Sequence, residues 1–199
     1  MIFKSTKIFR NLPCSHQQWQ DSDESCEYGT GHCAQTHGYS REFHFEFSCD
    51  EVDEYGWVVG FSSLKEMKNW LEFMFDHTSL WEAGDPRLQQ VQDFNSQLPF
   101  PAYNMRVLPS GVSMEQTALF VATHVCPHIA NVTGGRCWVS RIEVRENDKN
   151  SGILELSKSD SDNICQYSDK IQQVPLSKQK EYSYIPPHVL IKMISNSSN

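Results

Sequence analysis

The sequence lacks a long apolar run. No stretch approaches the roughly 20 consecutive apolar residues that a membrane-spanning helix needs. Residues 1–10 are basic, but no apolar segment follows them that would suit a secretory signal. We therefore expect a cytoplasmic protein, of a cell or of an infected host, that has no membrane partner.

The cysteines lack the regular spacing of a disulfide framework. They form an odd set of seven, at positions 14, 26, 33, 49, 126, 137 and 165. Without an export signal, they are better interpreted as free thiols, a metal ligand or a nucleophile.

Basic residues are in the minority. The chain has 17 Lys and Arg against 25 Asp and Glu, which gives a net charge of −8. This balance argues against a general binder of nucleic acid or of membrane surfaces, because both carry negative charge. A local basic pocket for a phosphorylated substrate remains compatible with it.

The length of 199 residues, with 39% hydrophobic residues, is enough for one domain with a real core. Periodic patterns occupy residues 1–156, which we expect to form that domain. Residues 81–111 hold four prolines and little periodicity, which predicts a long insertion or loop. Residues 157–199 are polar and predict a partly ordered C-terminal extension, with apolar residues in 184–191 as a docking point.

Alternation of apolar and polar residues predicts the strands. Residues 2–9 are β-prone, residues 37–47 and 136–146 alternate, and 153–156 suit a hairpin partner. In 37–47 the odd positions place three phenylalanines on one face, which we expect to be buried. His37, Tyr39 and Arg41 continue that face.

Capping boxes predict the starts of two helices. One begins at Ser63, with Glu66 three residues later, and ends near residues 76–77. The other begins at Ser113, pairs with Gln116, and stops at Pro127. The order β-β-α-α-β-β predicts an α+β fold with an antiparallel sheet and helices on one side.

His16 and His37 lie in separate predicted strands, and Cys33 precedes His37 by four residues. Imidazole is a common zinc ligand, and the two histidines converge if their strands are neighbours. The alternative is that each histidine is an ordinary polar residue.

Two further features could carry proton chemistry or ligand binding. In Asp76-His77, a carboxylate beside an imidazole can fix its tautomer, or the pair can simply end a helix that favours a cationic histidine. Glu146 continues the apolar face of its strand. It is either released to solvent or a buried acceptor, which could accept twice from the adjacent N–H groups of a 2-amino-4-oxopyrimidine ring.

Six blocks together resemble the 6-pyruvoyl and 6-carboxytetrahydropterin synthase family. The most specific is the segment 31–39, Gly-His-Cys-Ala-Gln-Thr-His-Gly-Tyr, which is similar to the family's Cys-x-x-x-His-Gly-His signature. The others lie at 9–16 (Phe…Cys-Ser-His), 56–65 (Gly-Trp-Val-Val-Gly-Phe-Ser-Ser-Leu-Lys), 75–80 (Phe-Asp-His-Thr-Ser-Leu), 113–118 (Ser-Met-Glu-Gln-Thr-Ala) and 144–147 (Val-Arg-Glu-Asn). The spacing from Cys33 to His37 favours the 6-carboxytetrahydropterin synthase branch.

The resemblance implies a tunnelling fold, in which a four-stranded antiparallel sheet with two helices assembles into an oligomeric barrel. The usual assembly is a homohexamer of two trimers, with sites between subunits. The implied enzyme is a zinc-dependent carbon–carbon lyase. It converts 7,8-dihydroneopterin triphosphate to 6-carboxytetrahydropterin, releasing acetaldehyde and triphosphate, on the route to 7-deazaguanine and queuosine.

The resemblance also implies residue roles. His16 and His37 would bind Zn²⁺, with Tyr39 at the position of the family's third histidine ligand. Cys33 and His77 would handle protons, and Asp76 would orient His77. The expected substrate-binding residues are Glu146, which would anchor the pterin ring, Ser113 and Glu115.

Two positions depart from the family pattern. Tyr39 replaces a histidine, and a phenol must lose a proton to ligate zinc because its free pKa is about 10. Gly60 replaces an aspartate before Phe61. The alternative function is therefore a tunnelling-fold protein that binds a pterin or deazaguanine without zinc chemistry.

Overall fold

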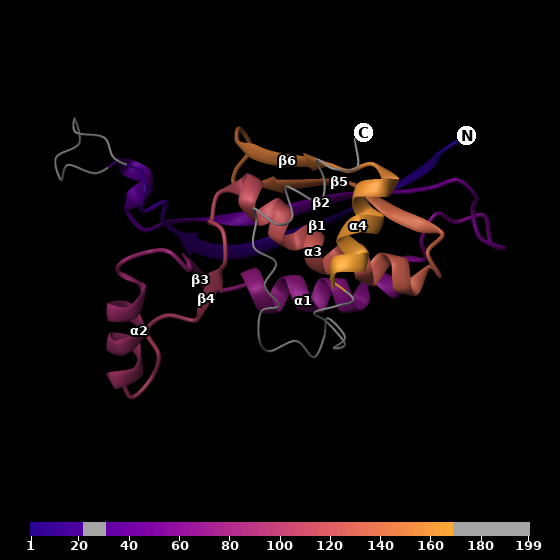
Figure 1. The fold of residues 1–199 in the computed structure, drawn as a ribbon. Coiled ribbons are helices and arrows are strands. Elements are labelled where there is room, and N and C mark those ends of the chain that lie inside the picture. Colours follow the sequence, from indigo (N-terminus) through magenta and orange to yellow (C-terminus); the bar gives the residue numbers. More distant parts are fainter. Residues whose placement is uncertain (22–30, 169–199) are drawn as a thin grey trace.

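The computed structural model describes residues 1–21 and 31–168. Its strands are β1 (Phe3–His16), β2 (His37–Cys49), β3 (Thr78–Glu82), β4 (Met105–Leu108), β5 (Cys137–Arg145) and β6 (Ser151–Glu155). Its α-helices are α1 (Lys65–Phe75), α2 (Leu88–Gln97), α3 (Met114–Val132) and α4 (Lys158–Ser168) (Figure 1). Short 3₁₀ turns lie at His32–Ala34 and Phe61–Leu64. None of the helices described here is long and apolar enough to cross a membrane.

The strands form one six-stranded sheet in the order β4-β3-β1-β2-β5-β6, counted over the described residues. The strands β1, β2, β5 and β6 pair antiparallel, as predicted. The predicted number of four strands is wrong, because β3 and β4 extend the sheet by parallel pairing beyond β1. The strands β3 and β4 are too short for an alternating pattern to be recognised in the sequence. In addition, four of the five residues of β3 are buried, so its two faces do not differ in polarity.

The α+β class and the predicted inward face are confirmed. The helices α1, α3 and α4 lie on one side of the sheet (Figure 1). Phe43, Phe45 and Phe47 of β2 are at most 1% exposed in the core. The opposite side of β2 carries Glu42 and Glu46, which pair with Arg10 and Lys4 of β1.

A β-bulge in β1 decides which way the end of that strand faces. The register with β2 shifts by one residue between Phe9 and Leu12. Side chains alternate along a strand, so the extra residue turns Leu12 and His16 to the same face as Phe9. All three are buried there. Asn11, in the bulge, adopts a left-handed φ of 62°.

The predicted boundaries of the first two helices need correction. Ser63 does not cap α1: its hydroxyl donates to the Gly60 carbonyl at 2.6 Å inside a 3₁₀ turn, and the helix starts at Lys65. Ser113 does cap α3 and accepts from the Gln116 backbone N–H. Pro127 lies inside α3 instead of ending it. The helix continues because Val125, Cys126 and Ile129 on either side of it are buried in the core, and packing outweighs the lost hydrogen bond.

The segment 81–111 is not a plain loop, because it contains α2 and β4. Both elements are short and lie between prolines, so neither shows a periodic pattern long enough to predict it. The start of the C-terminal extension forms α4, which packs against α3 through the buried Ile164. The proposed docking residues in 184–191 lie outside the described residues.

We predict that the bulge tolerates glycine but not a β-branched residue. Asn11→Gly should change the free energy of unfolding by less than about 0.5 kcal/mol, since glycine adopts a left-handed φ freely. Asn11→Val should lower it by about 1–2 kcal/mol. Urea unfolding of the two variants measures this. Equal stability of both would show that the left-handed conformation at residue 11 carries no cost.

Stability should fall in mild acid because of His124. This histidine of α3 is 2% exposed and stacks on Trp70 with ring centroids 4.6 Å apart. Burial lowers its pKa to about 4, against a partial opposing effect of the bond to the Phe120 carbonyl. The unfolded chain, with a histidine pKa near 6.5, therefore binds the proton first as pH falls.

The His124 contribution is complete above pH 6.5 and is lost between pH 6.5 and about 4, amounting to about 3 kcal/mol. Urea unfolding at several pH values should show a shallower pH slope for His124→Gln than for wild type. Parallel slopes would contradict the assignment.

Candidate active site

The register of β1 and β2 brings two histidines together. His16, the last residue of β1, pairs directly with His37, the first residue of β2. Their ring centroids lie 4.4 Å apart, and His16 is 5% exposed. Gly38 permits this approach, because a Cβ there would lie 2.9 Å from the Cys14 carbonyl oxygen. The predicted convergence of the two imidazoles is therefore present in the fold.

The two imidazoles differ in their hydrogen bonding. The Nδ1 of His37 lies 2.7 Å from the Gln35 carbonyl oxygen, which can only accept. Nδ1 therefore carries the proton, and Nε2 presents its lone pair. The Nδ1 of His16 is buried and has no hydrogen-bond partner among the described residues. A buried nitrogen without a hydrogen bond lowers the free energy of unfolding, because it loses its contact with water and gains no partner.

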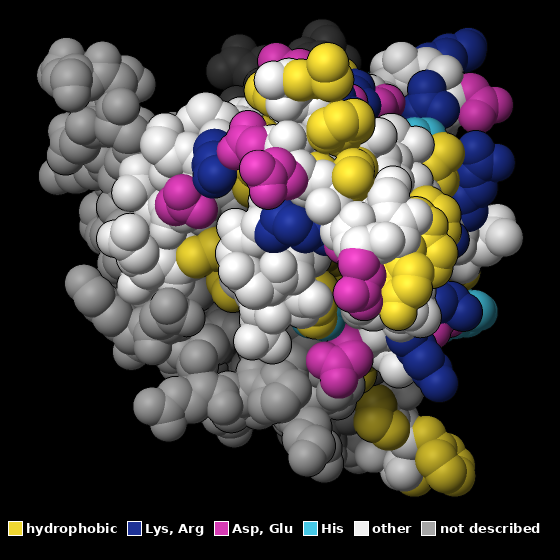
Figure 2. Space-filling model, turned by 90° about the vertical axis from the view of Figure 1, so that its right-hand side faces the viewer, with side chains coloured by type: hydrophobic (Ala, Val, Ile, Leu, Met, Phe, Trp, Pro, Cys, Tyr) yellow, Lys and Arg dark blue, Asp and Glu magenta, His cyan; other side chains and the backbone are white. Residues whose placement is uncertain are grey.

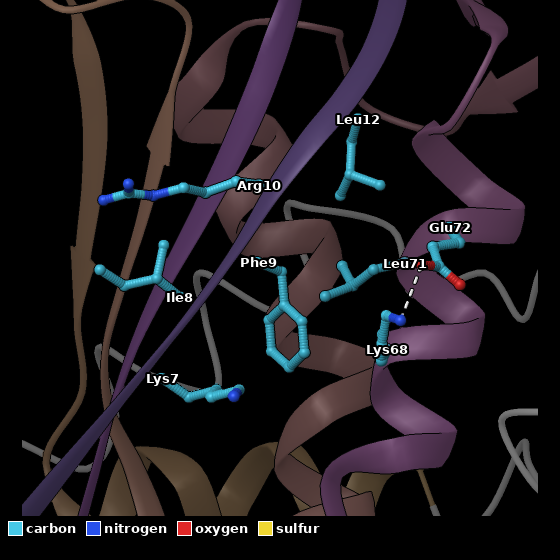
Figure 3. A pocket seen from close by; sticks show the side chains of 8 residues that line it. All are labelled: Lys7, Ile8, Phe9, Arg10, Leu12, Lys68, Leu71 and Glu72. Carbon is cyan, nitrogen blue, oxygen red and sulfur yellow. Dashed lines mark ion pairs between the residues drawn. The ribbon is translucent and has the colours of Figure 1, made fainter.

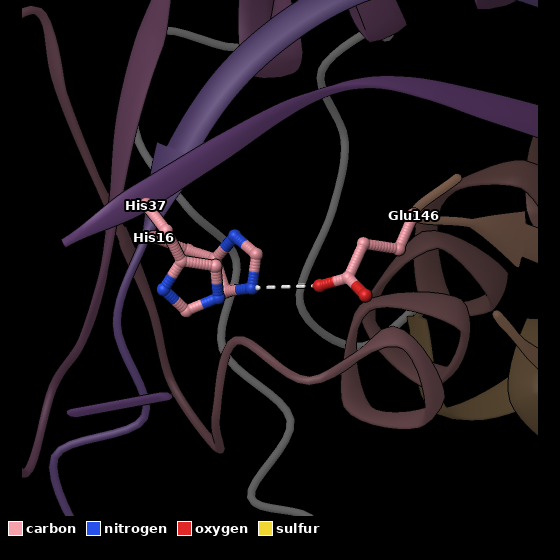
Figure 4. A group of neighbouring side chains, drawn as sticks. All are labelled: His16, His37 and Glu146. Carbon is pink, nitrogen blue, oxygen red and sulfur yellow. Dashed lines mark ion pairs between the residues drawn. The ribbon is translucent and has the colours of Figure 1, made fainter. Parts of the chain in front are cut away.

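Glu146 supplies a carboxylate to the same place (Figure 4). It follows β5, and its Oε1 lies 3.5 Å from the Nε2 of His16. Its other oxygen, Oε2, accepts from the side-chain amides of Asn147 and Asn150 at 3.3 and 3.5 Å. One ligand atom each from His16, His37 and Glu146 lies within 4.8 Å of the others.

A buried cation, Arg41, lies beside this cluster. Its side chain is wholly buried, and it donates to the Thr117 hydroxyl at 2.9 Å and the Val112 carbonyl at 3.0 Å. Burial lowers the pKa of His16 to about 3, and the charge of Arg41 and the neighbouring His37 add to the effect. His16 is therefore neutral near pH 7, the form in which imidazole binds metals. Alternation along residues 37–47 predicts that Arg41 lies on the same face as His37. It does not indicate the hydrogen-bond partners of Arg41, which come from residues 112 and 117.

These residues fit a zinc ion. Two imidazoles and a carboxylate form a three-ligand set of the kind that leaves a fourth position open in catalytic zinc sites. The carbonyl bond to His37 is the kind of outer contact that orients ligating histidines.

Tyr39 is placed less favourably than Glu146 for binding a metal ion together with His16 and His37. It is 40% exposed, and its ring meets His37 edge-on, with centroids 5.9 Å apart. Its role as a ligand stays a prediction.

Cys33 lies in the exposed 3₁₀ turn before β2. Burial, with the charges of Asp21 and Glu146, raises the pKa of its thiol. The thiol therefore lies within electrostatic reach of Glu146 and is protonated near pH 7.

Asp76 and His77 form a hydrogen-bonded pair at the end of α1. Asp76 Oδ1 accepts from His77 Nδ1 at 2.6 Å, and the His77 side chain is 82% exposed. His77 adopts a φ of 54°, rare for a residue with a side chain, and its backbone N–H donates to the Pro13 carbonyl at 2.7 Å. The hydrogen bonds and ion pairs within residues 1–21 and 31–168 do not link this pair to Cys33.

The remaining predicted residues lie at the start of α3. Ser113 caps the helix, and Glu115 is exposed in the first turn. Arg41 ties this turn to the histidine cluster through its bonds to residues 112 and 117.

Other surface features lie elsewhere. A cavity of about 290 Å³ lies between β1 and α1, lined by Lys7, Phe9, Lys68 and other residues (Figure 3). It spans residues 7–12 of β1, whereas the cluster lies at that strand's end. Figure 2 shows apolar side chains next to acidic and basic ones on one face of the described residues.

Comparison with known proteins gives a family and a fold. The family model described as 6-pyruvoyl tetrahydropterin synthase matches residues 6–156. An uncharacterized protein, WS1659 of Wolinella succinogenes, has a similar structure, with a TM-score of 0.64 and 16% identity over 79% of this chain and 99% of that one.

Two Plasmodium enzymes are also similar. The 6-pyruvoyltetrahydropterin synthase of Plasmodium vivax, in the form of a catalytic residue mutant, has a TM-score of 0.53 and 15% identity, over 78% of this chain and 99% of that one. The corresponding Plasmodium falciparum synthase has a TM-score of 0.52 and 16% identity, over 77% and 98%. A search of curated protein sequences finds no match.

The family match covers most of the chain, and it spans every residue of the histidine–carboxylate cluster. The chain belongs to the 6-pyruvoyl tetrahydropterin synthase family.

Proposed function

We propose that this protein is a zinc-dependent carbon–carbon lyase of the 6-carboxytetrahydropterin synthase type. Its substrate is 7,8-dihydroneopterin triphosphate, and its product serves 7-deazaguanine and queuosine synthesis. The observation that carries the proposal is the meeting of His16, His37 and Glu146 in a chain of this family. The spacing from Cys33 to His37 favours this branch.

His16, His37 and Glu146 would hold the zinc ion. When bound, zinc supplies Lewis acidity that lowers the pKa of substrate hydroxyls. This ligand set differs from the one expected from sequence, in which Tyr39 is the third ligand and Glu146 anchors the pterin ring. If Glu146 binds the metal, Glu115 is the only carboxylate left among the three predicted substrate-binding residues, and it would bind the pterin ring together with Ser113.

Cys33 and His77 would move the protons. The raised pKa of Cys33 keeps a proton on its sulfur, so the thiol can donate it. Asp76 accepts the Nδ1 proton of His77 and leaves Nε2 free to take another. The exposed position of His77 suits a site that a neighbouring copy completes, as in the expected hexamer of two trimers.

A second candidate function is binding of a pterin or deazaguanine without zinc chemistry. Tyr39, at the third histidine position, favours it. Arg41 favours it as well, because its fixed positive charge opposes a nearby divalent cation.

Metal analysis tests the ligand set. We expect about one zinc per chain in protein purified without added metal, and competition with a chromophoric chelator measures its affinity. Glu146→Gln should weaken zinc binding by about 100-fold or more, since even outer-contact changes cost 10–100-fold. Tyr39→Phe should change it less than about threefold. The reverse pattern would restore Tyr39 as the ligand, and absence of zinc from wild type would favour the second function.

The release of acetaldehyde from 7,8-dihydroneopterin triphosphate tests the activity. Cys33→Ala should lower the rate by about 10²–10⁴-fold, the usual contribution of a positioned acid or base. Cys165→Ala is the matched control on α4. If wild type and Cys33→Ala are equally inert while a pterin still binds, the enzyme proposal fails and the binding protein remains.

A further inference from the structure

The turn that carries Cys33 needs support from outside itself. It is a three-residue 3₁₀ helix with no side-chain cap at its start. Its internal bonds are those from Ala34 N to Gly31 O and from Gln35 N to His32 O. So short a turn has little stability of its own, because few hydrogen bonds offset the ordering of its backbone.

Direct support comes from the chain that follows β1. The Gln18 backbone N–H donates to the Cys33 carbonyl at 2.6 Å. The Cys33 backbone N–H donates to Asp21 Oδ2 at 3.1 Å. The Cys33 peptide is thus held at both its N–H and its carbonyl by residues 18–21.

Residues 18–21 are held in turn by the end of β3. Glu82 Oε2 accepts from the indole N–H of Trp19 at 2.9 Å and from the side-chain amide of Gln20 at 2.6 Å. Glu82 pairs with Leu108 of β4, so this anchor belongs to the sheet.

A second anchor is the buried carboxylate of Asp85. Its side chain is 0% exposed, and it accepts from the Nε and the backbone N–H of Arg87 at 3.0 and 2.8 Å and from Nη2 at 2.9 Å. Burial alone would raise the pKa of Asp85, but the bonds and charge of Arg87, with a smaller effect of the Gln17 side chain, lower it overall. Asp85 is thus a charged hub.

The Asp85–Arg87 pair contacts the Cys33 turn directly, and Gln17 links the end of β1 to the start of β2 beside it. Arg87 Nη1 donates to the carbonyl of Ala34, the residue after Cys33, at 3.3 Å. Gln17, which follows His16, is 1% exposed. Its Oε1 accepts from the hydroxyl of Thr36, the residue before His37, at 3.3 Å.

We propose that residues 82–87, which we call the brace, position the Cys33 turn against the histidine pair, with Asp85 as the principal positioning residue. The brace lies at the start of the segment that the sequence predicts as an insertion. It gives that segment a part in the site: it holds the thiol turn at a fixed place beside the strand ends that carry His16 and His37. The catalytic meaning of this positioning rests on the proposed function, but the brace itself does not.

Hydrogen exchange followed by mass spectrometry tests the brace without any assay of activity. In Asp85→Asn, amide exchange in peptides covering 31–37 should become about tenfold faster, because Arg87 loses the buried carboxylate charge that holds it and the turn opens more often. Peptides of α3 and β5 should exchange as in wild type. The matched control is Asp93→Asn, an exposed carboxylate on α2 that bonds to Gln89. It should leave residues 31–37 unchanged.

The outcomes separate the brace from general stability. Unchanged exchange in 31–37, or an equal increase throughout the chain, overturns the proposal. Should Asp85→Asn fail to fold, Glu82→Gln and Arg87→Lys decide it by the same local readout. Each removes one anchor while keeping a similar side chain.

Steady-state kinetics then link the brace to the reaction. In an active enzyme, Asp85→Asn should lower kcat about tenfold with little change in KM, since the thiol is displaced while the ligand cluster remains. If Asp85→Asn instead raises KM about tenfold and leaves kcat unchanged, the positioning role is overturned. If wild type proves inert while exchange in 31–37 still responds to Asp85→Asn, the proposed function fails and the brace stands.

Discussion

The pairing of His16 with His37 is the constraint on which the rest of the site depends. It requires the long antiparallel match of β1 and β2, and within it the bulge at residues 10–11. Without the extra residue, His16 would point to the charged side of the sheet, away from His37. Gly38 adds the close approach of the backbones. One local irregularity and one missing side chain therefore convert a regular hairpin into a place where two imidazoles meet.

Charge is the second constraint, because the cluster holds a permanent cation that cannot be released to solvent. Arg41 is fully buried, and its charge interacts with Glu146 and with His16. A buried charge is tolerated when its hydrogen bonds are made and an opposite charge is near. Burial lowers the pKa of Arg41, and the charges of Cys14 and Glu146 act in the opposite direction. On the proposed ligand set, the same carboxylate offsets both Arg41 and the metal, so Glu146 has more influence on the site than its position at a strand end suggests.

The sequence predicts those parts of the fold whose signals are local and repeated. The phenylalanines of β2, the cap at Ser113 and the end of α1 near Asp76 follow from alternation and capping, and the structure agrees. The parts it misses depend on contacts between distant segments. β3 and β4 join the sheet by parallel pairing, α3 passes Pro127 because its faces are buried, and Ser63 turns to a 3₁₀ carbonyl instead of capping. In the site, residue types indicate His16, His37 and Cys33, but neither the nearness of Glu146 to His16 nor the buried state of Arg41 and Asp85 can be read from spacing.

The meeting of His16 and His37 depends on the backbone geometry of β1 and β2. Identity to the WS1659 structure is 16%, yet the family match spans residues 6–156. A strand register survives many side-chain changes as long as the inward face stays apolar. A ligand at the third position can then change, provided that another donor stands within reach of the two histidines. Glu146 meets that condition at 3.5 Å from His16, on a strand that pairs with β2 for independent reasons of packing. On the proposed ligand set, Tyr39 at the position where the resemblance implies a histidine leaves the meeting of His16, His37 and Glu146 intact.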